Sequence, residues 1–429
     1  MVSVSEFISE EKYLFDSVAN GYMSKYFFVP VGSEKDGLKE LLVQKGDEVK
    51  EGQVIAKGRF ENVHSPVPGI VSDIFVGDYG DGKQGLIIKI MLSGAFSITG
   101  KKHDKIDWKI YDSSSLAFML RDAGIENTFK KAEPIYKQIK EISEKESKVL
   151  VIRLFDEDPE RCTDSFVTRK FSQKIYGGAA ILARAIEATA VVFAYEKSFK
   201  PDESVLGEYF DSDAKLFFVP IDVKKYPFGT MHDLVSSIKK HKSCRNPIFE
   251  KLGAKDFFVD SVTLASIYDA IVFEKPLIDR YIHVNGASLN VTGILNLKIG
   301  TLISSVVEQF GGFKEPPARI IINGIVTGLA ATGLNVPISK NVKSITFLPQ
   351  EQVAPQHTEI CIRCGRCRKI CPVNLWPGNI YRAAHSENEE PDVLKISLLC
   401  SECGLCNAVC PSRIPLCQTI ALVKEKIKE

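Results

Sequence analysis

Three absences narrow what this chain can be. No run of apolar residues approaches the roughly 18 that a membrane-spanning helix needs. The first residues, MVSVSEFISEEKYLF, lack the basic start and the long apolar stretch of a secretory signal. An excess of one charge is also missing, because 55 Lys and Arg balance 54 Asp and Glu to a net charge of +1. We therefore expect a chain that is not exported, does not cross a membrane and does not bind nucleic acid.

Cysteine, in contrast, is abundant. Eleven cysteines in an unexported chain indicate metal ligation rather than disulfides. Eight of them form two copies of the pattern Cys-x2-Cys-x2-Cys-x3-Cys-Pro, the spacing of the bacterial two-cluster ferredoxin run, in which three close thiolates bind one [4Fe–4S] cube and the fourth reaches the other. The expected ligand sets are Cys361, Cys364, Cys367 and Cys410 for one cluster, and Cys400, Cys403, Cys406 and Cys371 for the other. The pattern predicts a protein that carries electrons.

Structural zinc is the alternative for paired CxxC motifs. Zinc needs four ligands and has no use for a doubled array of eight cysteines, so we favour two iron–sulfur clusters. The other three cysteines, Cys162, Cys244 and Cys417, are interpreted as buried or spare thiols.

The first 100 residues predict a small β-rich module, because short β-branched runs alternate with turns at Gly46 and Gly52. The two halves, VQKGDEVKEGQVI and VHSPVPGIVSDI, resemble the biotinyl/lipoyl-like hammerhead fold. A carrier domain would display a lysine on a tight turn between the halves, and Lys57 is not in that context. We therefore expect a structural module.

Residues 101–275 predict an α/β domain. The stretch 112–147 has helical character, and from Lys148 the strand-like runs VLVIRLF, ATAVVFAYE and LFFVPI alternate with helical segments. Such alternation favours a largely parallel sheet. The pair Gly177-Gly178 lies in a helical segment and lacks the GxGxxG spacing, so helix packing explains it better than nucleotide binding.

Two further segments complete an α+β multidomain chain. Residues 276–350 contain two strand-like runs, a helix that begins near Thr301, and a linker. Residues 351–429 hold both cysteine motifs and predict a two-cluster ferredoxin-like domain.

These pieces, in this order, resemble the C subunit of the Rnf ion-translocating electron transport complex over almost the whole chain. HSPVPGIVSDI resembles the family's hammerhead signature, GASLNVTGILNLKIGTLISSVVEQFGG its SLBB (soluble-ligand-binding β-grasp) segment, and IINGIVTGLAATGLNVPISKNVKSITFLP its linker to the ferredoxin region. The resemblance implies a subunit that is peripheral on the cytoplasmic face of the membrane. It also implies electron exchange with NADH through FMN, in a fold shared with the flavin subunit of respiratory complex I.

The sequence departs from this family at the flavin site. After Ala123-Gly124-Ile125 the family has a loop of the type GMGGAGFP, whereas this chain continues ENTFKKAEPIYKQI. Glycines let backbone N–H groups approach a phosphate, and a Cβ at each position obstructs that approach. The NGAECEP-like motif is replaced by RLFDEDPERC, with Arg153 and Leu154 in place of Asn-Gly. The YPxGxE motif survives as Tyr226-Pro227-Phe228-Gly229 without its glutamate.

We therefore expect no FMN or NADH site at the family's position, with a site rebuilt from other residues as the alternative. In that case the acidic run Asp156, Glu157 and Asp158 needs no function, and a solvated loop is the simplest interpretation.

The leading hypothesis is an electron-transfer subunit of an Rnf-like complex that relays electrons between a soluble ferredoxin or flavodoxin and membrane subunits. The alternatives are an NADH:acceptor oxidoreductase with a remodelled FMN site, and a scaffold that positions a ferredoxin domain. The first cysteine motif carries a group of basic residues, which could raise the potential of its cluster, dock an acidic carrier, or simply face solvent. These residues are Arg363, Arg366, Arg368 and Lys369.

Overall fold

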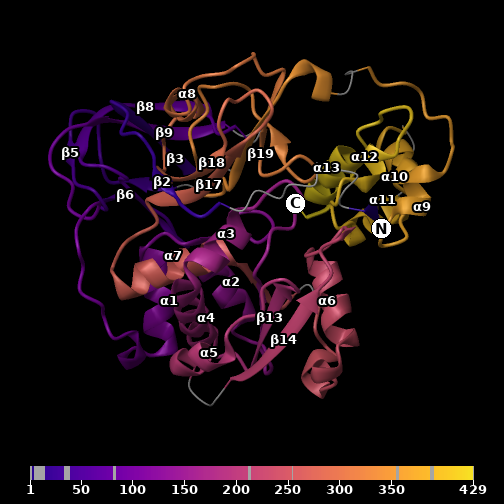
Figure 1. The fold of residues 1–429 in the computed structure, drawn as a ribbon, viewed down its shortest axis with the longest axis horizontal. Coiled ribbons are helices and arrows are strands. Elements are labelled where there is room, and N and C mark those ends of the chain that lie inside the picture. The colour runs from indigo at the N-terminus through magenta and orange to yellow at the C-terminus, as the bar shows by residue number, and fades with distance from the viewer. Residues whose placement is uncertain are drawn as a thin grey trace.

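The computed structural model describes residues 2–3, 15–32, 39–80, 84–210, 214–253, 255–353, 357–386 and 391–428. Figure 1 shows three regions: an upper region of strands, a lower layer in which helices flank a sheet, and a lobe of short helices, α9 to α13, to one side. The chain thus mixes α and β structure, as the sequence predicts.

The N-terminal region is built from two small antiparallel sheets. Strand β3 (Tyr26–Gly32) alternates half-buried and buried residues, so that Phe27, Val29 and Val31 enter one core, as period-2 patterning requires. The first sheet has the order β3-β9-β8-β5, with β9 at Gln84–Leu92, β8 at Gly69–Asp78 and β5 at Glu48–Val49. The second has the order β4-β6-β7, with bounds Glu40–Leu41, Val54–Lys57 and Asn62–His64.

A parallel four-stranded sheet forms the centre of the α/β region. Its order is β14-β13-β12-β16, with bounds Lys215–Ile221, Ala190–Glu196, Val149–Arg153 and Phe257–Asp260. Every residue of β12 is buried, because alternate side chains enter two different cores on the two faces of the sheet. The expectation of a parallel sheet from strand–helix alternation is confirmed.

Among the residues that the structure describes, seven α-helices belong to this region. They are α1 (Ser113–Asp122), α2 (Ile135–Ile142), α3 (Thr163–Lys170), α4 (Ser172–Ile186), α5 (Glu203–Tyr209), α6 (Met231–Lys240) and α7 (Ser261–Val272). The predicted helix over 112–147 is interrupted, since β10 (Glu126–Asn127) pairs with β11 (Glu133–Pro134) between α1 and α2. Pro134 lies where α2 begins and has no N–H to continue a helix from α1.

Gly177 and Gly178 allow α4 to lie close against α7. A Cβ on Gly178 would stand 2.1 Å from the Leu264 carbonyl oxygen, and one on Gly177 would stand 2.4 Å from the Tyr268 ring. Helix packing therefore accounts for this glycine pair.

A six-stranded sheet follows in the order β2-β18-β17-β21-β19-β20. Its strands are Ala19–Asn20, Gly293–Lys298, Asp279–Asn285, Ser344–Leu348, Arg319–Ile322 and Leu329–Ala330. Helix α8 (Ile303–Gln309) begins two residues beyond the predicted start at Thr301. Near the N-terminus, β1 (Val2–Ser3) pairs with β15 (Lys225–Tyr226).

The cysteine motifs lie in the helical lobe. Its helices are α9 (Arg366–Ile370), α10 (Pro377–Ala384), α11 (Pro391–Lys395), α12 (Leu405–Ala408) and α13 (Leu416–Lys428). Within the described ranges, no helix combines the length and the apolarity that crossing a membrane requires.

Buried Lys340 joins three parts of the chain. Its Nζ contacts the Glu61 carboxylate at 2.9 Å and donates to the carbonyl oxygens of Gly124 at 2.9 Å and Asn62 at 3.3 Å. The linker before the ferredoxin-like lobe is thus tied to both the N-terminal sheets and the turn after α1.

Candidate iron–sulfur site

The two cysteine motifs fold as copies of one another. Gly365 and Gly404 occupy the same place in their motifs and have φ of +73° and +74°, and each is followed at once by a short helix, α9 or α12. Arg363 and Glu402, also equivalent, both have positive φ. This turn presents the closely spaced cysteines of each motif from one segment, which is the arrangement the spacing predicts.

Around the second motif the structure brings together the predicted cysteines. Cys371, from the first motif, lines one pocket with Cys400, Cys403 and Cys406. The other walls are mostly apolar, from residues such as Leu375.

Backbone N–H groups also point at sulfurs of this pocket. The Leu375 N–H donates to Cys371 Sγ, and the Glu402 N–H donates to Cys400 Sγ, both at 3.3 Å. Cysteine sulfurs as iron ligands, apolar walls, and backbone N–H groups that point at sulfur are features that fit a [4Fe–4S] cluster.

The first motif is arranged more openly. Cys367 and Cys410 pack in one small apolar cluster together with Cys406 and Cys417, whereas Cys361 and Cys364 are exposed. A single zinc ion would need four donors converging on one point. In the part of the chain that the structure describes, no three His, Cys, Asp or Glu side chains are grouped in that way. The preference for iron–sulfur clusters over zinc therefore rests on the doubled spacing of eight cysteines.

The second motif is buried against the α/β region. Cys403 and Leu405 belong to the same core as Phe129, Phe155 and Phe228 on one face of the parallel sheet. The Tyr226 hydroxyl donates to the Cys403 carbonyl oxygen at 2.7 Å, and Lys130 pairs with Glu402 at 3.1 Å. The first motif therefore faces solvent, and the second motif faces the α/β region.

Arg153 lies where the three segments that differ from the family's flavin motifs meet. Its side chain is fully buried, and its guanidinium donates to the Gly229 carbonyl oxygen at 2.8 Å and to the Phe129 carbonyl oxygen at 3.0 Å, and pairs with Glu157 at 2.5 Å. Phe129 belongs to the segment that replaces the glycine-rich loop, and Gly229 to the remnant of YPxGxE. One arginine thus joins all three altered segments.

The expectation that Asp156, Glu157 and Asp158 form a solvated loop is wrong. Only 1% of Asp156 and of Asp158 is exposed. Asp156 accepts from the N–H groups of Asp164 at 3.0 Å and Ser165 at 2.9 Å, which lie in the first turn of α3, and it pairs with Arg161 at 2.9 Å.

Asp158, unlike Asp156, accepts hydrogen bonds from a segment that is distant in the sequence. Its carboxylate accepts from the N–H groups of Val326 at 3.0 Å and Thr327 at 2.9 Å. Burial raises the pKa of Asp158, although Arg161 and these hydrogen bonds oppose the shift. The acidic run therefore has a structural role that joins the α/β region to the linker.

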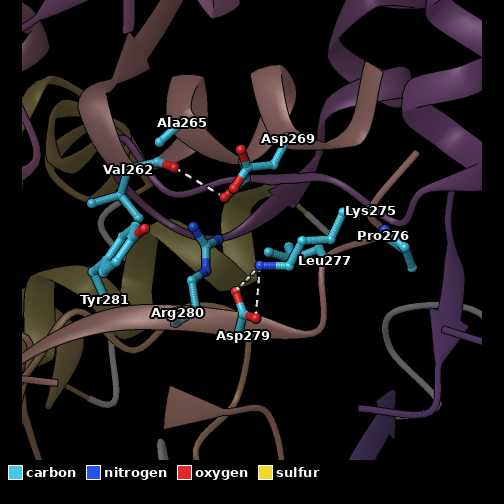
Figure 2. Close-up of a pocket in the computed structure, with 10 residues that line it drawn as sticks. Val262, Ala265, Asp269, Lys275, Pro276, Leu277, Asp279, Arg280 and Tyr281 are labelled. Carbon is cyan, nitrogen blue, oxygen red and sulfur yellow. Dashed lines mark hydrogen bonds and ion pairs between the residues drawn. The ribbon is translucent and has the colours of Figure 1, made fainter. Parts of the chain in front are cut away.

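A small cavity lies next to α7. Figure 2 shows Arg280 pointing from β17 into this space, beside the ion pair of Lys275 and Asp279 at 2.7 Å. The cavity measures about 20 Å³, room for about one water. The two terminal nitrogens of buried Arg280 have no hydrogen-bond partner among the described residues, and a water there would satisfy them.

Comparisons with known proteins agree with the site. A family model for a 4Fe-4S dicluster domain matches residues 357–414. The C subunit of the proton-translocating ferredoxin:NAD(+) oxidoreductase complex of Clostridium ljungdahlii is 28% identical over 358 residues, which cover 82% of this chain and 76% of that protein. The C subunit of the ion-translocating oxidoreductase complex of Rhodobacter capsulatus is 28% identical over 397 residues, covering 91% and 76%.

Among solved structures, the air-oxidized NAD+-reducing [NiFe]-hydrogenase matches 56% of this chain and 47% of its own, at 14% identity and a TM-score of 0.43. A TM-score this low does not show that the two chains share a fold.

Proposed function

We propose that this chain, whose resemblance to the C subunits of ion-translocating oxidoreductase complexes is confirmed over most of its length, is the electron-transfer subunit of an Rnf-type complex. It relays electrons through two [4Fe–4S] clusters between a soluble carrier, ferredoxin or flavodoxin, and the membrane subunits. The chain is peripheral and attaches through those subunits at the inner face of the cell membrane.

The position of Cys371 carries the proposal. A thiol that ends the first motif lies in the wall of the pocket formed by the second, as the crossed ligation of a two-cluster ferredoxin requires. The proposed ligands are therefore the two sets predicted from the spacing. When bound, the clusters supply one-electron carriage, and the chain's part is to hold them, to donate N–H groups to their sulfurs and to exclude water from the second one.

We also propose that the chain has four domains, in the order that the family resemblance implies. Residues 1–100 form a hammerhead-like module, supported by the two small antiparallel sheets. Residues 101–275 form an α/β domain related to the complex I flavin subunit, and 276–350 an SLBB-like β-grasp segment and linker, supported by the parallel sheet and by the mixed sheet with α8. Residues 351–429 form the ferredoxin-like domain.

In this proposal the α/β domain binds no FMN, and the chain does not oxidise NADH itself. Buried Arg153, bound to Phe129 and Gly229, supports this because it occupies the junction of the three altered flavin motifs. A remodelled flavin site would need space for an isoalloxazine ring and a phosphate, and neither the core around Arg153 nor the small cavity beside Arg280 offers it.

The exposed first motif is the proposed docking point for the soluble carrier. Cys361 and Cys364 are exposed, and Arg363, Arg366 and Lys369 beside them face solvent. Positive charge around an exposed cluster attracts an acidic protein and speeds encounter. Arg368 differs, since its guanidinium stacks on the Trp376 ring with 3.6 Å to the centroid.

Paired substitutions test the crossed ligation. Cys371→Ser and Cys403→Ser each remove one cluster, and the double variant loses no more iron or electron paramagnetic resonance (EPR) signal than either alone, because both residues serve the same cube. Cys371→Ser combined with Cys364→Ser loses both clusters. Cys244→Ala, a buried thiol of the α/β domain, is the control and keeps the full iron content. If Cys371→Ser combined with Cys403→Ser loses both clusters, the crossed assignment is wrong.

A further inference from the structure

A fifth cysteine lies at the second cluster site. Cys417, which the sequence left as a spare thiol, lines the same pocket as Cys371, Cys400, Cys403 and Cys406. It packs in the same small apolar cluster as Cys406. Since four cysteines already supply one ligand to each iron of a cube, Cys417 is left beside the ligands as a fifth thiol.

The position of Cys417 is fixed by its neighbours. It lies in the first turn of α13, and its backbone N–H donates to the Asn407 side-chain oxygen at 2.8 Å. Asn407 is also bound through its amide nitrogen to Gln418. Because Asn407 directly follows Cys406, this bridge holds the start of α13 against the third cysteine of the motif.

The internal repeat shows what the first motif has in the same place. Cys417 follows Cys410-Pro411 at the spacing at which Gly378 follows Cys371-Pro372, and both begin a helix of the lobe, α13 or α10. A Cβ on Gly378 would stand 3.6 Å from Cys367 Sγ, an ordinary contact distance. The first motif therefore has room for a side chain at this position but carries none, so the thiol distinguishes the two cluster sites.

We propose that Cys417 is a positioning residue that donates an S–H hydrogen bond to the Cys406 sulfur and raises the reduction potential of the second cluster. The inference rests on the proposed function, because it needs Cys406 to ligate iron. A ligating cysteine is a thiolate and accepts hydrogen bonds only, so the proton of the pair belongs to Cys417. A donor to a ligand sulfur stabilises the more negative, reduced state, and hydrogen bonds to sulfur are among the features that set cluster potential.

EPR-monitored redox titration of the anaerobically iron-loaded full chain tests this. Cys417→Ala is expected to lower the reduction potential of the second cluster. At a fixed solution potential, the ratio of oxidised to reduced cluster should rise about tenfold, which corresponds to about 59 mV for a one-electron couple. The first cluster titrates unchanged. Cys417→Ser keeps a donor and retains most of the wild-type potential, which separates donation from mere filling of space. Gly378→Ser adds a donor at the first cluster and raises only that potential.

Three results would overturn the proposal. Cys417→Ala with both clusters present and both potentials unchanged shows that the thiol does not tune the cluster. Loss of the second cluster in both Cys417→Ala and Cys417→Ser, with the first retained, shows that Cys417 is itself a ligand. Equal shifts in Cys417→Ala and Cys417→Ser show that packing, not donation, sets the potential. Failure of the proposed function is distinct, since wild-type protein would then not load two clusters.

Discussion

The guanidinium of Arg153 lies over the ring of Phe129, 4.1 Å from the ring centroid, while it donates to the carbonyl oxygen of the same residue. Both residues stand in segments that the family resemblance assigns to flavin binding. A buried cation needs several partners to offset its desolvation, and Arg153 finds them in the backbone and ring of Phe129, in Gly229 and in Glu157. The three segments are thus joined through one closed set of polar contacts around Arg153.

Replacing Arg153 with Met should destabilise the protein without restoring flavin binding. The change leaves two buried carbonyl groups without a donor and removes the nearest partner of Glu157. We expect the free energy of unfolding to fall by about 3–5 kcal/mol. Urea unfolding monitored by circular dichroism measures the cost. Arg245→Ala, on an exposed side chain, is the control and should change stability by less than about 0.5 kcal/mol. FMN binding by the Arg153→Met variant, followed by fluorescence quenching, would contradict the closed-site account.

The two glycines of the α4–α7 contact allow a test of packing against nucleotide binding. Gly178→Ala places a Cβ against the Leu264 carbonyl oxygen and should lower the free energy of unfolding by about 1–3 kcal/mol. Gly207→Ala, in α5 with open space around the new Cβ, should instead stabilise by about 0.5–1 kcal/mol. Thermal unfolding of both variants gives the comparison. Equal stabilisation by the two substitutions would show that α4 and α7 do not lie as close as described.

Glu160 should make the protein less stable as pH rises from about 4.5 to about 7. Burial, and then the neighbouring Asp158, raise its pKa from 4.5 to about 7, while a hydrogen bond from Asn285 opposes the shift. Between these values the native state binds more protons than the unfolded state, so stability falls with pH by roughly 2–3 kcal/mol and levels off above pH 7.

The Glu160→Gln variant isolates this effect because it keeps an acceptor for Asn285 and cannot ionise. It should match wild type near pH 4 and exceed it by the same roughly 2–3 kcal/mol at pH 8. Exposed Glu250→Gln serves as the control and should follow wild type at both values. A Glu160→Gln difference that is constant with pH would mean that Glu160 ionises normally in the folded protein.

Charge reversal at the first motif tests the proposed docking face. Arg363→Glu is tolerated by the turn, since Glu402 occupies the equivalent positive-φ position in the second motif. Stopped-flow reduction by reduced ferredoxin should slow several-fold at low salt, and the difference should vanish at about 1 M salt, where charges are screened beyond about 3 Å. Lys251→Glu makes the same charge change on an exposed side chain of the α/β domain and should leave the rate unchanged. Equal slowing by both variants would indicate a general effect of net charge.

The sequence predicted most accurately those features whose partners are close along the chain. The cysteine spacing defines both turns because each motif lies within one short segment, and strand–helix alternation indicated the parallel sheet. The burial of Asp158 was missed because its partners, Val326 and Thr327, lie far away in sequence. Cys417 was interpreted as a buried or spare thiol, although its match to Gly378 in the internal repeat is visible in the sequence.

The most direct test of the account is an anaerobic titration of the iron-loaded protein with NADH and, separately, with reduced ferredoxin, following the clusters by absorbance and EPR. We expect iron and sulfide for two [4Fe–4S] clusters per chain, no bound FMN, no reduction by NADH, and reduction of both clusters by ferredoxin. Reduction by NADH together with bound FMN would contradict it, because the α/β domain would then hold a working flavin site despite Arg153.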